Sequence, residues 1–203
     1  IFFSLLLAVN GQEVPWEPAA RAEPASWPEI VKEQAQMMKQ KPARLIFIGD
    51  SITEGWERAD PAFFAAGNAN RGISGQTSPQ MLLRFWQDVI ALRPRAVHIM
   101  AGTNDIAGNT GPTSAEAYKN TIRAMVSLAR ANGVAVIIGS ILPADRFGWK
   151  PAMRPAGRVA ELDAWLRDFA QTEGSFNKLM GKGEAASRRE LMELHGDTVE
   201  VDV

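Results

Sequence analysis

The sequence predicts an α/β fold in which a mainly parallel sheet carries helices on both faces. Apolar runs that suit buried strands alternate along the chain with amphipathic stretches that suit helices, which is the pattern of a parallel sheet. The composition agrees with this class. At 203 residues, with 46% hydrophobic and 22% charged residues, the chain suits one globular domain with a sizeable core.

The individual elements follow from hydrophobic periodicity. Continuous apolar runs predict strands over 43–49, 69–72, 96–102 and 134–140, of which 69–72 is the weakest. Apolar residues at helical spacing predict helices over 27–41, 78–92, 114–132 and 156–171. Ser26 suits the N-cap of the first helix, Thr113 or Ser114 suits that of the third, and Gly133 suits its end.

The two ends of the chain differ from this pattern. Residues 1–11 form an apolar run that is too short to span a bilayer and suits the remnant of a secretory signal peptide. A buried N-terminal strand is the alternative. The signal peptide is favoured because the Pro- and Glu-rich residues that follow suit a loop, and it predicts a secreted or periplasmic protein. We expect an N-terminal extension and helix over 12–42, the main domain over 43–174 and an atypical tail over 175–203.

Charge and rare residues exclude several classes of function. The 22 Lys and Arg balance 23 Asp and Glu, so the surface as a whole attracts neither nucleic acid nor an anionic membrane. The absence of Cys excludes disulfides, thiolate nucleophiles and Cys-based zinc sites. Only His98 and His195 are available as histidine bases. His98 lies inside a predicted strand, so we expect it to be a packed or hydrogen-bonded residue of the sheet.

Polar residues of similar kinds follow three of the predicted strands, over 49–56, 70–77 and 101–109. Ligands of open α/β sheets bind beyond the carboxyl ends of the strands, where these segments meet. Ser51 follows a tight Gly-Asp turn that directs its hydroxyl into the cleft. Gly72 has no Cβ to keep a substrate from its N–H, and Asn104 offers a side-chain amide as a second donor. A nucleophile and oxyanion donors therefore meet at this edge, as hydrolysis requires.

These segments resemble the first three blocks of the SGNH (GDSL) hydrolase superfamily. The matching motifs are Gly-Asp-Ser-Ile-Thr-Glu-Gly, Asn-Arg-Gly-Ile-Ser-Gly-Gln and Gly-Thr-Asn-Asp, and the stretch 104–112 is similar to secreted lysophospholipase-like and acetylhydrolase-like esterases. The resemblance implies a flavodoxin-like three-layer α/β/α sandwich and a serine esterase. Ser51 would be the nucleophile, and the Ser51 and Gly72 amides with the Asn104 side chain would form the oxyanion hole. It implies a small ester substrate, such as a short-chain ester, an acetylated sugar or a lysophospholipid, and no metal or cofactor.

Each motif alone has an ordinary explanation. Gly-Asp-Ser is a common turn, Gly72 suits a turn, and Asn104 suits a helix cap. Their joint occurrence at three strand ends favours the catalytic interpretation. Asp50, Glu54 and Asp105 form a second candidate cluster, for which capping and orienting the loops is favoured over metal binding. A phosphate-binding loop is disfavoured because no Gly-Lys-Ser/Thr follows any strand.

The superfamily's C-terminal block, an Asp three residues before the catalytic His, is not found. Met192 lies three residues before His195, Asp197 lies two residues after it, and no apolar strand run follows Gly174 before 199–201. We therefore expect the chain to depart from the family after Gly174, which leaves open whether the last strand and helix are missing. Two hypotheses follow. Either His195 replaces the usual base, or the domain is crippled or truncated and only binds, because a serine without a base is a weak nucleophile.

Overall fold

The computed structural model describes residues 44–172, and it describes residues 176–178 as a strand. Several expectations lie outside the described residues: the signal-peptide remnant over 1–11, the helix over 27–41, most of the tail over 175–203, and His195. Within residues 44–172, no helix combines the length and the hydropathy that crossing a bilayer requires.

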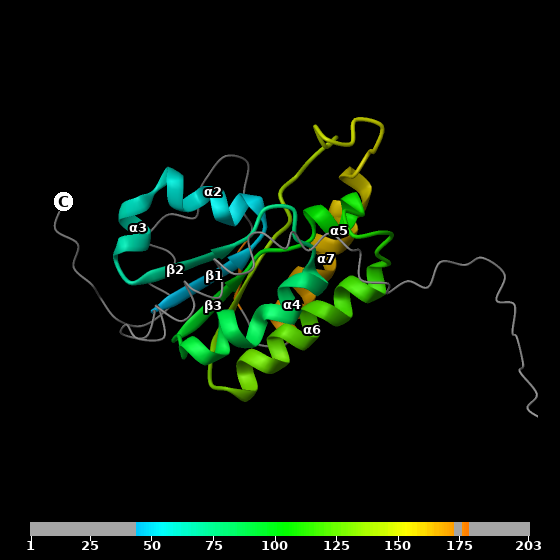
Figure 1. Ribbon diagram of the computed structural model, residues 1–203. Coiled ribbons are helices and arrows are strands. Elements are labelled where there is room, and N and C mark those ends of the chain that lie inside the picture. Colours follow the sequence, from blue (N-terminus) through cyan, green and yellow to red (C-terminus); the bar gives the residue numbers. More distant parts are fainter. Residues whose placement is uncertain (1–43, 173–175, 179–203) are drawn as a thin grey trace, which may run out of the picture.

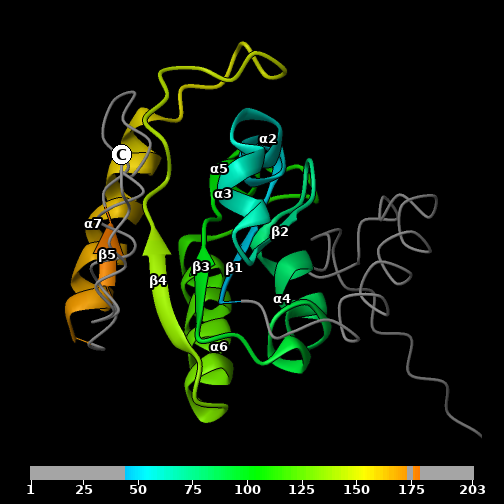
Figure 2. The same cartoon turned by 90° about the vertical axis from the view of Figure 1, so that its left-hand side faces the viewer.

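The described strands form one sheet of five parallel strands in the order β2-β1-β3-β4-β5 (Figure 2). The strands are β1 (Leu45–Gly49), β2 (Asn68–Gly72), β3 (Ala96–Ile99), β4 (Ala135–Gly139) and β5 (Phe176–Lys178). From β1 the chain first adds β2 on one side and then β3 on the other. In open α/β sheets ligands bind where the strand order reverses, beyond the carboxyl ends of the two strands that flank this point, here β1 and β3.

Helices cover both faces of the sheet, as the sequence predicts (Figure 1). On one face, helices α4 (Ser78–Asp88), α6 (Ala115–Ala131) and α7 (Ala156–Thr172) bury the larger core. Alternate strand residues such as Ile46, Val97 and Ile138 point into it, because successive side chains of a strand face opposite sides. On the other face, α2 (Ser51–Ala59) and α3 (Pro61–Ala65) enclose an aromatic cluster around Phe47.

Local sequence explains where the helices begin. Ser114 caps α6 by accepting a hydrogen bond from the Ala117 N–H at 3.0 Å. Thr77 and Gln80 form a capping box at the start of α4. The predicted helix over 78–92 divides into α4 and the 3₁₀ turn η1 (Ile90–Leu92). The periodicity did not predict α2, α3 or α5 (Thr103–Ala107), which are short helices that begin directly after strands or loops.

Strand β5 answers the question, left open by the sequence, of whether a last strand follows Gly174. Phe176, Asn177 and Lys178 pair in parallel with Ile137, Ile138 and Gly139 of β4. The segment has no β-branched residue, and it adopts strand geometry because the buried residues 137–139 of the neighbouring strand offer it a ladder of backbone partners. The other open question, whether the last helix is missing, concerns residues outside the described part of the chain.

Candidate active site

The candidate site begins at the tight turn between β1 and α2. Asp50 is the N-cap of α2 and accepts a hydrogen bond from the Ile52 N–H at 2.9 Å. A Cβ on Gly49 would lie 2.0 Å from the Thr53 hydroxyl oxygen, so only glycine allows the helix to start this close to the strand. The turn places Ser51 at the first position of the helix.

Ser51 has the position that a nucleophile needs. Its side chain is exposed, and neither its hydroxyl nor its backbone N–H has a hydrogen-bond partner within residues 44–172. It stands at the positive end of the nine-residue helix α2, where a developing negative charge is favoured. The prediction that Ser51 is presented at a strand end is therefore matched by the geometry of the turn.

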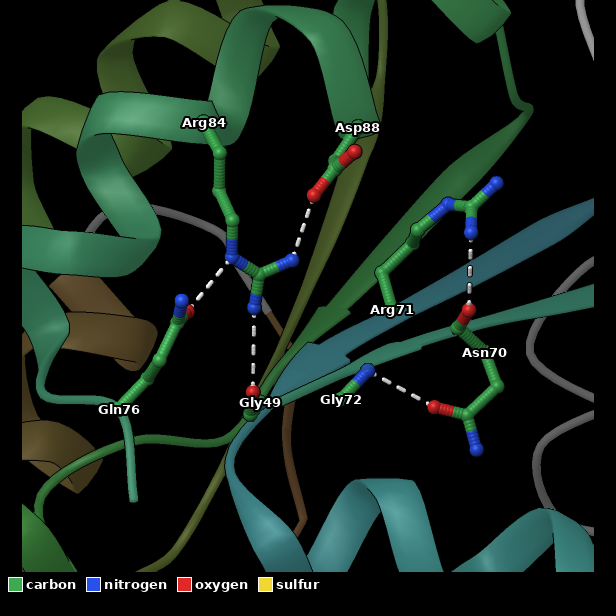
Figure 3. Close-up of polar contacts among 7 residues, drawn as sticks. All are labelled: Gly49, Asn70, Arg71, Gly72, Gln76, Arg84 and Asp88. Atoms are coloured by element: carbon green, nitrogen blue, oxygen red, sulfur yellow. Dashed lines mark hydrogen bonds and ion pairs between the residues drawn. The ribbon is translucent and has the colours of Figure 1, made fainter. Parts of the chain in front are cut away.

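Gly72, at the end of β2, has a structural reason to be glycine. A Cβ there would lie 2.1 Å from the backbone nitrogen of Glu54, so the first turn of α2 packs directly against it. Its N–H donates to the side-chain oxygen of Asn70 at 2.8 Å (Figure 3). The donor that the sequence assigns to the oxyanion hole is thus already engaged within the protein.

Gly75, three residues further along the same motif, has different properties. Its φ of +78° lies in the left-handed region, which explains the glycine, since a Cβ would meet nothing within 4 Å. Its N–H has no hydrogen-bond partner in the part of the chain that the structure describes, and the residue is exposed. Gly75 was not among the site residues predicted from the sequence. The available signal was a second glycine, followed by Gln76, in the same block.

Asn104 on α5 joins the three strand ends. The side chain is 4% exposed, and its Nδ2 donates to the Asp50 carboxylate at 3.2 Å and to the Gln76 carbonyl at 2.9 Å. Its Oδ1 accepts from Asn109 Nδ2 at 2.8 Å, which fixes the orientation of the amide. Because one side chain contacts the neighbours of both Ser51 and Gly75, the three segments converge as the sequence predicts.

Two buried carboxyls support these loops. Asp105 accepts hydrogen bonds from the Ser78 hydroxyl at 2.6 Å and from the Ser78 N–H, which ties α5 to the start of α4. Burial raises the pKa of Asp105, against these hydrogen bonds. The pKa of Asp50 is raised to about 6, chiefly by burial and to a smaller extent by the nearby Asp105, against the hydrogen bond from the Ile52 N–H. Both side chains have the capping and orienting roles that the sequence favours. Within residues 44–172, no group of three or more His, Asp or Glu side chains could hold a metal ion.

His98 is a packed residue of the sheet, as predicted. It is 2% exposed in β3 and lies 5.1 Å from Phe47 and 6.4 Å from Trp56, measured between ring centroids. Burial lowers the pKa of His98 to about 4. Its Nδ1 has no hydrogen-bond partner in the described part of the chain. A ring held neutral within the aromatic cluster is not placed to serve Ser51, and the other histidine, His195, lies outside the described residues.

The comparison with known protein families agrees with this geometry. The model of the GDSL-like lipase/acylhydrolase family matches residues 47–192. The chain belongs to this family. The match spans all three strand-end motifs and continues to residue 192. It therefore corrects the expectation that the chain departs from the family after Gly174. Membership places the protein among the carboxylic ester hydrolases.

Solved structures of other proteins share this fold. A GDSL-like lipase from Bacteroides thetaiotaomicron is 39% identical, with a TM-score of 0.72 over 76% of this chain and 78% of that one. The acetylxylan esterase Axe2 from Geobacillus stearothermophilus is 22% identical, with a TM-score of 0.54 over 68% of this chain and 77% of that one, a likeness of fold alone. A lipoprotein of Bacillus subtilis named YqeF is 32% identical over 77 residues, or 36% of this chain and about a third of its own length.

Proposed function

We propose that the chain is a serine esterase that hydrolyses small acyl esters through a covalent acyl-enzyme, with Ser51 as the nucleophile. One observation carries the proposal. The Ser51 hydroxyl is exposed at the start of α2, and Asn104 links Asp50 and Gln76, the neighbours of Ser51 and Gly75. A nucleophile next to free backbone donors is the arrangement that acyl transfer requires.

In this reaction the Ser51 oxygen attacks the ester carbonyl, and the carbonyl oxygen takes up the negative charge. The N–H groups of Ser51 and Gly75 stabilise that oxyanion, together with the side chain of Asn104. We assign the second backbone donor to Gly75 and not to Gly72, because the Gly72 N–H already donates to Asn70. Asn104 makes two hydrogen bonds through Nδ2, and the longer one, of 3.2 Å to Asp50, is exchanged for a hydrogen bond to the oxyanion.

We propose His195 as the base, since the sequence has two histidines and His98 is buried in the sheet. His195 takes the proton of the Ser51 hydroxyl as the acyl ester forms, and passes it to the departing alcohol. Water then attacks the acyl-enzyme and gives up a proton to His195, which passes it to the Ser51 oxygen as the carboxylic acid leaves. The substrates we propose are short-chain esters, acetylated sugars or lysophospholipids.

We further propose that the protein acts outside the cytoplasm. Two observations support this location: the apolar run over residues 1–11 and the match to a protein that is named a lipoprotein. Fractionation of cells that express the complete gene tests it, and recovery of the protein in the cytoplasmic fraction alone would contradict it.

The test of the function is hydrolysis of p-nitrophenyl acetate by the purified chain. We expect turnover that is lost in Ser51→Ala and retained in Ser127→Ala, an exposed serine on α6 that serves as the matched control. A folded parent that binds short esters but does not turn them over would contradict the proposal and support a binding domain.

A further inference from the structure

Arg84 of α4 is a buried charge at the edge of the candidate site. It is 1% exposed, and all three of its guanidinium nitrogens have an acceptor (Figure 3). One donates to the Asp88 carboxylate at 2.6 Å, another to the Gln76 side-chain oxygen at 2.7 Å, and the third to the Gly49 carbonyl at 3.2 Å. Asp88 lies on α4 as well, so the guanidinium joins this helix to the end of β1 and to the loop before α4.

The partners of Arg84 lie next to the proposed catalytic groups. The Gly49 carbonyl also accepts from the Ile73 N–H at 3.0 Å, so it binds the end of β1 to the segment after β2. Gly49 is followed by Asp50 and Ser51. Gln76 follows Gly75, and its own carbonyl accepts from Asn104 Nδ2 at 2.9 Å. Arg84 thus contacts Gly49, two residues before Ser51, and Gln76, one residue after Gly75. Asn104, the third proposed donor, is linked to Arg84 through its hydrogen bond to the Gln76 carbonyl.

Stability alone gives a weak reason for such a residue. A buried ion pair costs desolvation energy, and well-packed apolar side chains of similar volume often serve stability equally well. The neighbouring core positions of α4, Met81 and Phe85, are apolar and fully buried. What an apolar side chain cannot provide is three directed hydrogen bonds from one planar group, which fix the relative positions of their acceptors.

We propose that Arg84 is a positioning residue for the oxyanion hole: it sets the Ser51 turn through Gly49, and the Gly75 turn and Asn104 through Gln76. This inference rests on the proposed function. Asp88, which is fully buried one helical turn later, supplies the countercharge that keeps the guanidinium in place. A misplaced donor weakens transition-state binding more than substrate binding. Substitution of Arg84 should therefore lower kcat and leave KM nearly unchanged.

The test uses two substitutions that break the link at different points. Arg84→Lys keeps the charge beside Asp88 but cannot direct donors to three acceptors. Gln76→Met removes one acceptor at a partly exposed loop position and leaves the ion pair intact, while Gln76→Glu is the conservative variant that keeps the acceptor. Ile122→Ala is the matched control, because it opens the buried core on α6 and removes none of the hydrogen bonds of Arg84.

Each variant is titrated with a fluorophosphonate, and kcat is expressed per titrated site so that unfolded protein does not count. We expect kcat to fall about 10- to 100-fold in Arg84→Lys, less than on removal of an oxyanion donor itself. We expect a smaller fall in Gln76→Met, near-parent kcat in Gln76→Glu and Ile122→Ala, and KM within about threefold throughout. A kcat per site near that of the parent in both Arg84→Lys and Gln76→Met would overturn the proposal. If Arg84→Lys does not fold, the kcat per titrated site of Gln76→Met alone tests the proposal.

A second readout separates this proposal from the proposed function. The side-chain amide of Asn104 gives NMR signals whether or not the chain hydrolyses esters. Arg84→Lys and Gln76→Met should shift those signals, and Ile122→Ala should not. If the parent is inactive, the function fails and these shifts still decide the role of Arg84. Unchanged Asn104 signals in both variants would contradict it.

Discussion

His98 makes the stability of the protein depend on pH in a way that can be calculated. Burial lowers its pKa from 6.5 to about 4, so the folded state holds the ring neutral between these values. Above pH 6.5 both the folded and the unfolded chain carry a neutral imidazole, and no stability is lost. As the pH falls toward 4, the unfolded chain binds a proton that the folded chain does not, and the free energy of unfolding decreases.

One pKa unit corresponds to about 1.4 kcal/mol, so the loss is about 2 kcal/mol at pH 5 and about 3 kcal/mol at pH 4 and below. His98→Leu removes the titrating group and replaces it by an apolar side chain of similar size. The raised pKa of Asp50 works in the opposite direction, because its folded form loses stability as the pH rises. Asp50 is present in both proteins, so it cancels in the comparison.

The assay is urea unfolding of the parent and of His98→Leu at pH 7.5 and pH 5. We expect the parent to lose about 2 kcal/mol more than the variant between the two pH values, with similar m-values. Ile122→Val on α6 is the control and should follow the parent. An equal loss in parent and His98→Leu would refute the reasoning that His98 is held neutral by burial. We also expect His98→Leu to retain esterase activity, since the ring lies within the sheet.

Further predictions concern the site. Asn104→Ala should lower kcat by about 10²–10³ and leave KM within a few-fold, as steady-state kinetics will show. Gly72→Ala should cost about 3 kcal/mol of stability in urea unfolding because its Cβ meets the Glu54 backbone, whereas Gly75→Ala should cost about 1 kcal/mol for its positive φ. Equal costs would contradict the distinction. His195→Ala should remove nearly all esterase activity, and activity retained in this variant would place the base elsewhere.

The sequence predicts the fold well where hydrophobic periodicity decides the structure. Strands β1, β3 and β4 lie within the apolar runs at 43–49, 96–102 and 134–140. Helices α4, α6 and α7 correspond to the longer stretches of helical periodicity. The short helices α2 and α5 were not predicted, because a few residues after a strand are too few to show a period. Strand β5 was not predicted either, since its backbone pairing with β4 decides its geometry and its side chains do not.

The candidate site was predictable to the level of segments but not of individual donors. Three motifs at strand ends indicated that Ser51 and Asn104 meet, and the contacts of Asn104 with Asp50 and Gln76 agree. The sequence could not decide whether Gly72 or Gly75 supplies the second backbone donor. That choice depends on which of the two N–H groups already makes a hydrogen bond within the protein, and this is visible only in the structure. Nothing in the sequence indicated the role proposed for Arg84. In the sequence of an amphipathic helix, an arginine that will be buried cannot be distinguished from one that will be exposed to solvent.

The central claim, an acyl-enzyme at Ser51, is tested most directly by trapping that intermediate. The purified chain is mixed with p-nitrophenyl acetate, quenched in acid and digested, and the acetylated peptide is identified by mass spectrometry. We predict a single acetyl group on Ser51 that forms in the parent and is absent from Ser51→Ala. Acetylation of another residue, or hydrolysis by Ser51→Ala at the parent's rate, would contradict the claim.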